Sequence, residues 1–471
     1  MNDLPTSPQT EVADSAQAEQ STLVTAGQLA RRENRRELAF AAAVGLAAAL
    51  VFYFSTKPIF QHFDYTARIA MALMDRHLGV QTPPPAELNE MIPFDGRYYS
   101  AFPLGAVLSV VPVALLQKAG WLHNFPGGAV AALIAGLCAF FFFRLSSLEA
   151  KPLAKRVLLA LFPIFGTWLW CNLGFGGAWQ IALGLALVGE LGALYSTLLR
   201  PRPMIAGVFF ALAFGNRTEL ILTLPVFLYF LSRRSVIVGQ ALRLPSTANG
   251  AHSPITPMPT ISHSDEIGSA AASGPPITVK GSRWLRENWR PVTDFLVLPL
   301  TLGLLTAAYN YARFGSFFDF GYARIPNVLH EQWYKHGVFS LHAMPWNVTK
   351  MFLEGLGDRP DFPFLRLYPF GCSILIGSPF IGLIFREGGR YRRVCWIVIL
   401  VLTLVLCMQA NPEGWQFSYR YAIILLPWMF LLIAGNGPAK ISAIEISLFA
   451  VSIAINALAT WQFLWTSEVH P

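Results

Sequence analysis

Charged side chains are scarce in this sequence of 471 residues. Asp, Glu, Lys and Arg make up 13% of it, about half of the ~25% that is usual in soluble domains. This shortage excludes an ordinary soluble domain, and the 54% hydrophobic content excludes disorder over most of the chain. The net charge of +8 could indicate nucleic acid, but Lys and Arg cluster beside apolar runs, which is a membrane-topology pattern. We therefore expect a lipid bilayer and no nucleic acid as a partner.

Cysteine is also scarce, and none of the five cysteines forms a CxxC pair. Cys138, Cys395 and Cys407 lie inside apolar runs, where cysteine behaves as a small buried hydrophobe. Cys171 and Cys372 fall near the outer ends of predicted spans, which leaves one disulfide between them open. The sequence contains no HExxH, GxSxG, Walker A or GxGxxG pattern, so none of these motifs identifies a chemistry.

Long apolar runs are abundant: roughly eleven recur from Leu38 to Phe463, and about 20 such residues cross a bilayer as a helix. The sequence therefore predicts an all-α polytopic membrane protein with about eleven transmembrane helices. The predicted spans are residues 38–56, 127–143, 157–172, 178–199, 203–215, 218–232, 292–309, 370–385, 394–409, 420–435 and 441–463.

The orientation follows from the basic residues. Arg31, Arg32, Arg35 and Arg36 directly precede the first span and place the N-terminus in the cytoplasm. Because a polar tail of more than thirty residues precedes Leu38–Thr56, we interpret this run as a retained span and not as a cleaved signal peptide.

One apolar segment decides the topology. Phe102–Gln117 contains Pro103 and Pro112, and if it spanned the bilayer the basic cluster Arg144–Arg156 would move outside. If it lies along the surface or re-enters, every basic cluster falls inside. We adopt the second reading, which makes this segment a juxtamembrane helix and the C-terminus external.

The predicted organisation has two transmembrane modules and two long external loops. It comprises a disordered cytoplasmic tail (1–30), an N-terminal module (31–234) with the first external loop (57–126), a Ser/Pro-rich cytoplasmic linker (235–290), and a C-terminal module (291–471) with the second external loop (310–369).

Asp64 is the first candidate for chemistry, because it lies just beyond the outer end of the first span. A carboxylate there could accept a proton from an acceptor hydroxyl as a general base, or could hold a divalent metal ion. Alternatively, Asp64 and Arg68 are four residues apart and could simply pair on a helix.

Arginines among aromatic residues form the second group of candidates. Arg97, with Tyr98 and Tyr99, follows an Asp-Gly turn, and arginine can hold phosphate oxygens bidentately. Arg217 and Arg420 lie at the outer ends of predicted spans, where they suit a lipid phosphate. The alternatives are an aromatic belt at Tyr98 and Tyr99, a charged turn at Arg217, and interfacial anchoring at Arg420.

Carboxylates within spans need partners of their own. Glu190 lies deep in an apolar run and requires a partner that the sequence does not name. Glu445 lies near a cytoplasmic helix end, from which it can reach the interface.

Four stretches together resemble the GT-C superfamily of integral-membrane glycosyltransferases, in particular the bacterial relatives of protein mannosyltransferases and lipid A aminoarabinose transferases. They are Phe63-Asp64-Tyr65 after the first span, Tyr98–Gly105, the loop Tyr309–Tyr322, and Gln416–Tyr421 with Leu426-Pro427. The third resembles an NYxRFGSPxxFGY loop and the fourth an FGxRYLLPxLP element of that superfamily. The sequence departs from the family where Tyr65 replaces a frequent Glu and where the second proline of a Pro-Pro pair is missing before Leu104.

The resemblance implies a fold of about eleven helices and transfer of a sugar, with inversion, from a polyprenyl-phosphate donor to a glycan, lipid or protein acceptor. Asp64 would be the catalytic base, and Arg420, Arg97 or Arg217 would bind the donor phosphate. The substrate-binding set is completed by Tyr65, Arg68, Tyr98 and Tyr99.

The resemblance also implies a location in the cell envelope, as a multi-pass protein of the bacterial inner membrane with its site on the periplasmic face. A membrane transporter or lipid flippase is the alternative from another class, although Glu190 is the only deep charge and no inverted repeat is visible. A catalytically inactive GT-C-like protein is the third interpretation.

Cysteine labelling tests the topology. Single cysteines at Gly120→Cys and Ala150→Cys should react with impermeant reagents from opposite sides, residue 120 from outside and residue 150 from the cytoplasm. Labelling of residue 150 only from outside would contradict the juxtamembrane interpretation of Phe102–Gln117.

Overall fold

The computed structural model describes residues 8–241 and 281–469, apart from 359, 361–363, 370, 411–413 and 468. The described chain is helical except for loops and two short two-stranded sheets. Most of the predicted linker 235–290 lies outside the described residues, although its flanks continue α10 (Leu224–Ala241) and α11 (Gly281–Phe314).

Each predicted span contains helical segments of the structure. The helices are α1 (Pro8–Ser55), α5 (Gly127–Leu145), α6 (Leu153–Phe165), α7 (Leu169–Gly174), α8 (Ala178–Leu194), α9 (Pro203–Asn216), α10, α11, α13 (Ile374–Gly377), η9 (Pro379–Phe385), α14 (Arg392–Met408), α15 (Leu426–Asn436) and α16 (Ala443–Leu464). The predicted span 157–172 is broken between α6 and α7, and the span 370–385 is made of the short elements α13 and η9.

Five helices of the described chain are long and apolar enough to cross a bilayer. They are Arg32–Ser55, Gly127–Leu148, Ala178–Leu199, Trp289–Phe314 and Ala443–Leu464. Three further apolar helices are shorter, at Pro203–Asn216, Thr218–Ser232 and Arg420–Asn436. The all-α membrane class is therefore supported, whereas the predicted number of eleven spans is not confirmed.

Exposed apolar surface supports the membrane environment. The apolar stretches of α1, α11 and α16 are only 22%, 17% and 28% buried, whereas those of α5 and α8 are 72% and 89% buried. The two inner helices are thus surrounded by helices whose outward faces remain apolar. Soluble monomers rarely expose large contiguous apolar patches, but lipid tails solvate such faces well.

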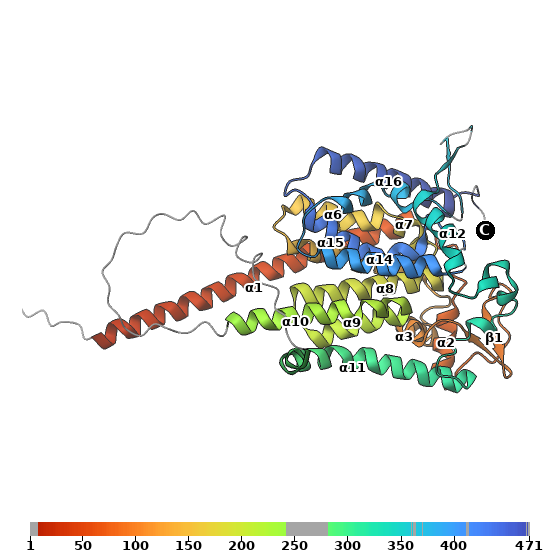
Figure 1. Cartoon of the computed structure of the whole chain (residues 1–471), viewed down its shortest axis with the longest axis horizontal. Helices are drawn as coiled ribbons and strands as arrows, with labels where there is room; N and C mark the ends of the chain where they lie inside the picture. The colour runs from red at the N-terminus through yellow and green to blue at the C-terminus, as the bar shows by residue number, and fades with distance from the viewer. Residues whose placement is uncertain are drawn as a thin grey trace, which may run out of the picture.

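Helix α1 begins at Pro8, so most of the predicted disordered tail continues the first helix. This part of the sequence is rich in Ala, Gln and Glu, which are strong helix formers and account for the difference. Figure 1 shows α1 extending well beyond the other helices at one end of the bundle.

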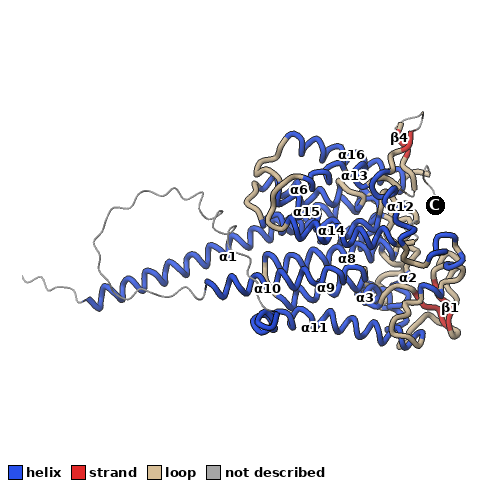
Figure 2. Tube along the Cα trace, in the orientation of Figure 1, coloured by secondary structure: helices blue, strands red, loops and turns tan. Residues whose placement is uncertain are grey.

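The two predicted external loops meet at the opposite end. Figure 1 shows α2 (Tyr65–Met74), β1 (Met91–Phe94) and α12 (Met344–Val348) together there. Figure 2 places the short strands β1 and β4 (Leu365–Arg366) at this end too. Strand β1 pairs in an antiparallel sheet with β2 (Arg97–Ser100), and β3 (Gly357–Asp358) pairs with β4.

The segment Phe102–Gln117 forms two short helices, α3 (Leu104–Ser109) and α4 (Val111–Lys118), and neither is long enough to span a bilayer. Helix α3 packs against the end of α9, where a Cβ added to Gly105 would lie 2.4 Å from the Gly215 Cα. The Asn216 side chain donates a hydrogen bond to the Ser109 hydroxyl at 2.8 Å. This arrangement agrees with the juxtamembrane interpretation of the segment.

All five cysteines are free and buried, so the disulfide left open between Cys171 and Cys372 is not formed. The expectation that the other three cysteines are small buried groups is confirmed.

Paired charges hold together the end of the bundle opposite the long loops. Glu445 is 1% exposed and is bound by Lys155 at 3.0 Å and Arg386 at 2.9 Å. It also closes a capping box with Ser442 at the start of α16. The expectation that Glu445 reaches the interface is therefore wrong, because two cations from other segments neutralise it inside the protein. Nearby, Glu37 accepts a hydrogen bond from Arg156 at 2.6 Å.

The substitution Glu445→Gln should destabilise the protein strongly, because it leaves Lys155 as a buried cation without its counter-charge. We expect a loss of about 3–5 kcal/mol, measured as a large fall in melting temperature of the detergent-solubilised protein. Glu33→Gln, at an exposed position, is the matched control and should melt like the unmodified protein. Equal melting temperatures for all three proteins would contradict the structural role of Glu445.

Candidate functional site

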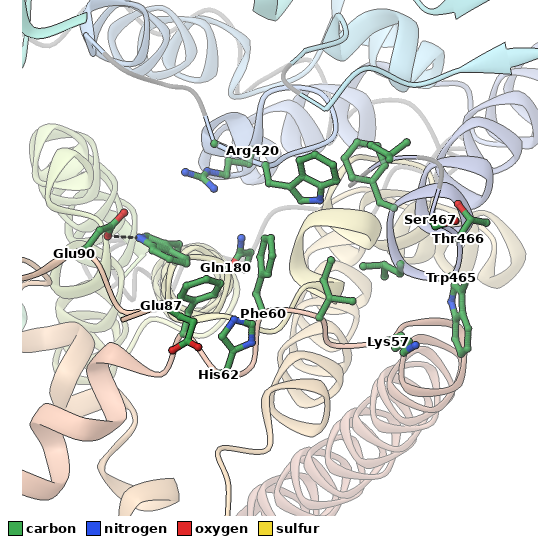
Figure 3. Close-up of a pocket in the computed structure, with 18 of the residues that line it drawn as sticks. Lys57, Phe60, His62, Glu87, Glu90, Gln180, Arg420, Trp465, Thr466 and Ser467 are labelled. Atoms are coloured by element: carbon green, nitrogen blue, oxygen red, sulfur yellow. Dashed lines mark hydrogen bonds between the residues drawn. The ribbon is translucent and has the colours of Figure 1, made fainter. Parts of the chain in front are cut away.

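A cavity of about 740 Å³ lies among the long loops and the ends of α8 and α16. Residues from five separate parts of the chain line it: the start of the first external loop, the stretch Glu87–Glu90, the first turn of α8, and two later segments around Arg420 and Trp465. Figure 3 shows their side chains converging on one space. The cavity brings together aromatic rings, carboxylates and one buried cation.

Arg420 is that buried cation, at 8% exposure. Its Nη2 donates to the Tyr421 hydroxyl at 3.0 Å, while its Nε has no partner within the described residues. The described chain also provides no ion pair for this guanidinium, in contrast to Arg217 and Arg68. A buried charge without a counter-charge is costly, which makes Arg420 the strongest candidate for binding an anion.

Local backbone structure holds Arg420 in position. It begins η10 (Arg420–Leu425), and its backbone N–H donates to the Gln416 side chain at 3.0 Å. Gly414 lies directly against the guanidinium, since a Cβ at that position would be 2.8 Å from Nη2. A larger residue at position 414 would therefore displace the cation.

Glu90 and Trp179 form a hydrogen-bonded pair in the cavity. The Trp179 indole Nε1 donates to Glu90 Oε2 at 2.9 Å, as the dashed line in Figure 3 marks. The Trp179 ring packs against Phe63 and Tyr65, with centroids 5.2 and 5.1 Å away. Burial raises the pKa of the Glu90 carboxyl, and the Trp179 hydrogen bond and the charge of Arg420 oppose this shift. The rings of Phe60, Phe63 and Trp179 line the cavity and form its aromatic wall. This wall offers a flat apolar surface on which a ring-shaped substrate can stack.

Sequence reasoning missed Glu90 and Trp179, because neither belongs to a recognisable motif. Glu90 lies in a polar stretch of the first loop, and Trp179 begins an apolar helix. Only the folded chain brings the two residues together, 89 positions apart in sequence.

Asp64, the predicted catalytic base, is paired with Arg68 through a 2.6 Å contact between the Asp64 Oδ1 and the Arg68 Nε. The structure thus contains the helical pairing that the spacing allowed as an alternative. Asp64 follows the cavity-lining Phe63 but does not itself line the cavity. Tyr65 lies behind the aromatic wall, and its hydroxyl contacts the Asn89 side chain at 3.5 Å.

Arg217 and Arg420 share one tyrosine. Their guanidinium carbons lie 4.7 and 4.9 Å from the centre of the Tyr421 ring. Arg217 is neutralised by Glu219 at 2.6 Å, as expected for a charged turn. The structure therefore brings two predicted phosphate ligands close together, but only Arg420 both lines the cavity and lacks an ion pair in the described chain.

Arg97, Tyr98 and Tyr99 belong to the β1–β2 hairpin and do not line the cavity. The Asp-Gly turn is confirmed, with Asp95 and Gly96 at φ +48° and +69°. The Tyr99 ring packs against Phe314 with centroids 5.5 Å apart. These tyrosines therefore stabilise the hairpin, and the structure does not place Arg97 with the other candidate arginines.

The loop that resembles the family at Tyr309–Tyr322 has a supporting role. Arg313 is 3% exposed and donates to the Ser100 carbonyl at 2.9 Å and to the Asn310 side chain at 2.6 Å. It thereby fastens the hairpin to the end of α11. Glu190, whose partner the sequence left unnamed, accepts a hydrogen bond from the Trp428 indole.

The second external loop approaches the same region. The hydroxyls of Tyr322 and Tyr334 lie 2.6 Å apart. Burial and the neighbouring Tyr334 raise the pKa of Tyr322, to which the charges of Tyr421 and Glu90 also contribute. Tyr322 of the second external loop therefore interacts electrostatically with Glu90, which lines the cavity.

Within the described residues, no group of three or more His, Cys, Asp or Glu side chains could hold a metal ion. His62, which lines the cavity, is accompanied by rings of Phe60 and Phe63 and not by a ligand set. Asp64, which could hold a divalent ion, is not part of any such group among the residues that the structure describes.

No protein-family model, curated protein or solved structure matches this chain. The chain's own residues show an apolar helical bundle with helices able to cross a membrane, and a cavity at the loop end that contains a buried cation without an ion pair in the described chain.

The raised pKa of Glu90 predicts a pH dependence of stability. Because the folded protein binds the Glu90 proton more tightly than the unfolded chain does, protonation of Glu90 stabilises the fold at low pH. This contribution is complete below about pH 4.5 and is lost as the pH rises through the higher pKa of the folded state, so the unmodified protein should lose stability towards neutral pH. Glu90→Gln, which keeps an acceptor for Trp179, should remove this loss and melt higher at pH 7. Melting curves from pH 4.5 to 8 check it, with the exposed Glu87→Gln as the control. A parallel pH profile for Glu90→Gln and the unmodified protein would contradict the prediction.

Proposed function

We propose that this protein is a membrane glycosyltransferase. It moves a sugar from a polyprenyl-phosphate donor to a glycan, lipid or protein acceptor at the outer face of the bacterial inner membrane, and inverts the anomeric carbon. The observation that carries the proposal is the buried Arg420, which has no ion pair in the described chain and faces an aromatic-walled cavity. The order of the GT-C-like stretches along the sequence adds support.

The position of the cavity suits a lipid-linked substrate. Long apolar helices adjoin it, so the polyprenyl chain could remain among lipid tails while the phosphate enters the cavity. Arg420 would bind the phosphate oxygens, and the wall formed by Trp179, Phe63 and Phe60 would pack against the sugar. A volume of about 740 Å³ is within the range of small-molecule sites and accommodates a sugar phosphate.

The proposed reaction is a direct displacement. The acceptor oxygen forms a bond to the anomeric carbon as the bond from that carbon to the phosphate oxygen breaks, and the phosphate leaves with the electron pair. Arg420 stabilises the charge that develops on the leaving phosphate. A carboxylate takes the acceptor proton, and the resemblance assigns this role to Asp64, which Arg68 holds in place at 2.6 Å.

Glu90 is the competing carboxylate, because it lines the cavity itself. In the proposal it positions Trp179 through its hydrogen bond, and Asp64 remains the base. The two assignments make different predictions for single variants.

Transfer from a panel of polyprenyl-phosphate sugars, measured on purified protein, tests the function and the base together. Asp64→Asn should lower the rate by about 10²–10⁴-fold while melting normally, since a general base typically contributes that much. Asp95→Asn, in the exposed hairpin turn, is the matched control and should retain full activity. Glu90→Gln keeps Asp64 as the base, so its transfer rate should fall less than that of Asp64→Asn.

Full activity in Asp64→Asn together with inactive Glu90→Gln would move the role of base to Glu90. No transfer by the folded, unmodified protein from any donor of the panel would contradict the proposed function.

A further inference from the structure

Gln180 is a buried amide that the fold leaves unsatisfied. Its side chain is 1% exposed and lines the cavity, and neither its Oε1 nor its Nε2 has a hydrogen-bond partner within the described residues. Buried polar groups are nearly always paired, so an amide with two unpartnered atoms beside an open space indicates a bound polar ligand.

The backbone around Gln180 also offers donors. Helix α8 starts at Ala178 after Gly177, which provides no side-chain cap. The Ala178 N–H donates to the Phe63 carbonyl at 3.0 Å. The next two N–H groups, of Trp179 and Gln180, have no acceptor in the described part of the chain. The first N–H groups and the dipole of this 17-residue helix favour a negative charge at this end.

Gly177 leaves room for the amide. A Cβ at that position would lie 2.9 Å from Gln180 Oε1 and 3.0 Å from the Phe60 carbonyl. The Gln180 Oε1 therefore lies beside Gly177, directly before the start of α8. The Gln180 amide and the first turn of α8 thus belong to the same wall of the cavity.

Arg420 supplies the positive charge of the same cavity. Its Nε is also buried and without a partner among the described residues. Figure 3 draws Arg420 and Gln180 among the side chains that line the space, with Glu90 held by its hydrogen bond to the neighbouring Trp179. A cation and neutral donors from separate segments therefore line the same space as two carboxylates, Glu87 and Glu90, of which Glu90 is hydrogen-bonded to Trp179.

We propose that Gln180, the N-terminus of α8 and Arg420 together form a binding site for a phosphate group. The Gln180 Nε2 and the two free backbone N–H groups would donate to phosphate oxygens, and the guanidinium would pair with the charge. The identity of this phosphate as the head of the lipid donor rests on the proposed function, whereas the site itself requires only a phosphate. Arg217 is outside the site, because Glu219 already neutralises it.

Direct binding to the full-length protein in detergent tests the site without any sugar transfer. The probes are farnesyl phosphate, the uncharged alcohol farnesol, and inorganic phosphate. Farnesyl phosphate should bind at least about tenfold more tightly than farnesol, since hydrogen bonds to a charged group typically contribute that much. Weak binding of inorganic phosphate would identify a lipid headgroup as the ligand, and equally tight binding would identify free phosphate; both would support an anion site.

Gln180→Glu replaces the amide by a carboxylate of the same shape that repels phosphate. It should weaken farnesyl phosphate binding by about tenfold or more and leave farnesol binding unchanged. Because a buried carboxylate can impair folding, the apolar Gln180→Leu gives a second measurement with the same expected direction. Gln117→Glu on α4, outside the cavity, is the matched control and should bind like the unmodified protein.

Equal affinities for farnesyl phosphate and farnesol, or unchanged farnesyl phosphate binding in folded Gln180→Leu, would overturn the inference. The two proposals fail separately. Phosphate binding that depends on Gln180 without any sugar transfer would contradict only the glycosyltransferase, and transfer that is insensitive to Gln180 would contradict only this site.

Discussion

The high cost of an unpaired charge in an apolar interior constrains this protein throughout. At the end opposite the loops, Glu445 is shared by Lys155 and Arg386, and Arg156 binds Glu37. Nearer the loops, Glu219 neutralises Arg217. Each pair joins segments or fixes a turn, since neither partner can stay in the interior alone. In the described chain Arg313, Glu190 and Arg420 are buried without an ion pair, and of these three only Arg420 lines the cavity.

The cavity depends on elements that are distant in the sequence. The first loop contributes Phe63 and Glu90, α8 contributes its first turn, and the segment before α15 contributes Arg420. Helix α8 is the most buried of the five long apolar helices, so packing on most of its surface fixes its position in the bundle. A site built on such a helix keeps its donors in place better than one built on loops alone.

Several residues of the two predicted external loops also hold this region together. Arg313 joins the β1–β2 hairpin to α11, and the Tyr99 ring of the hairpin packs against Phe314. Asp64 is fixed to Arg68 at the start of α2. These contacts explain why charged and aromatic residues recur at the loop end without all of them facing the cavity. The shape of the cavity depends on this support as much as on its lining.

The sequence by itself determined the helical class, the positions of the apolar helices and the Asp-Gly turn. These features follow from local composition, from the length of apolar runs and from turn preferences, which need no knowledge of distant neighbours. It also singled out Arg420 through its aromatic surroundings. The tertiary structure alone decided that Glu190 binds Trp428, that Glu445 is buried, and that Glu90, Trp179 and Gln180 meet Arg420. The physical reason is that pairing and burial depend on which side chains come within hydrogen-bond distance across the bundle, and no local pattern encodes those distances.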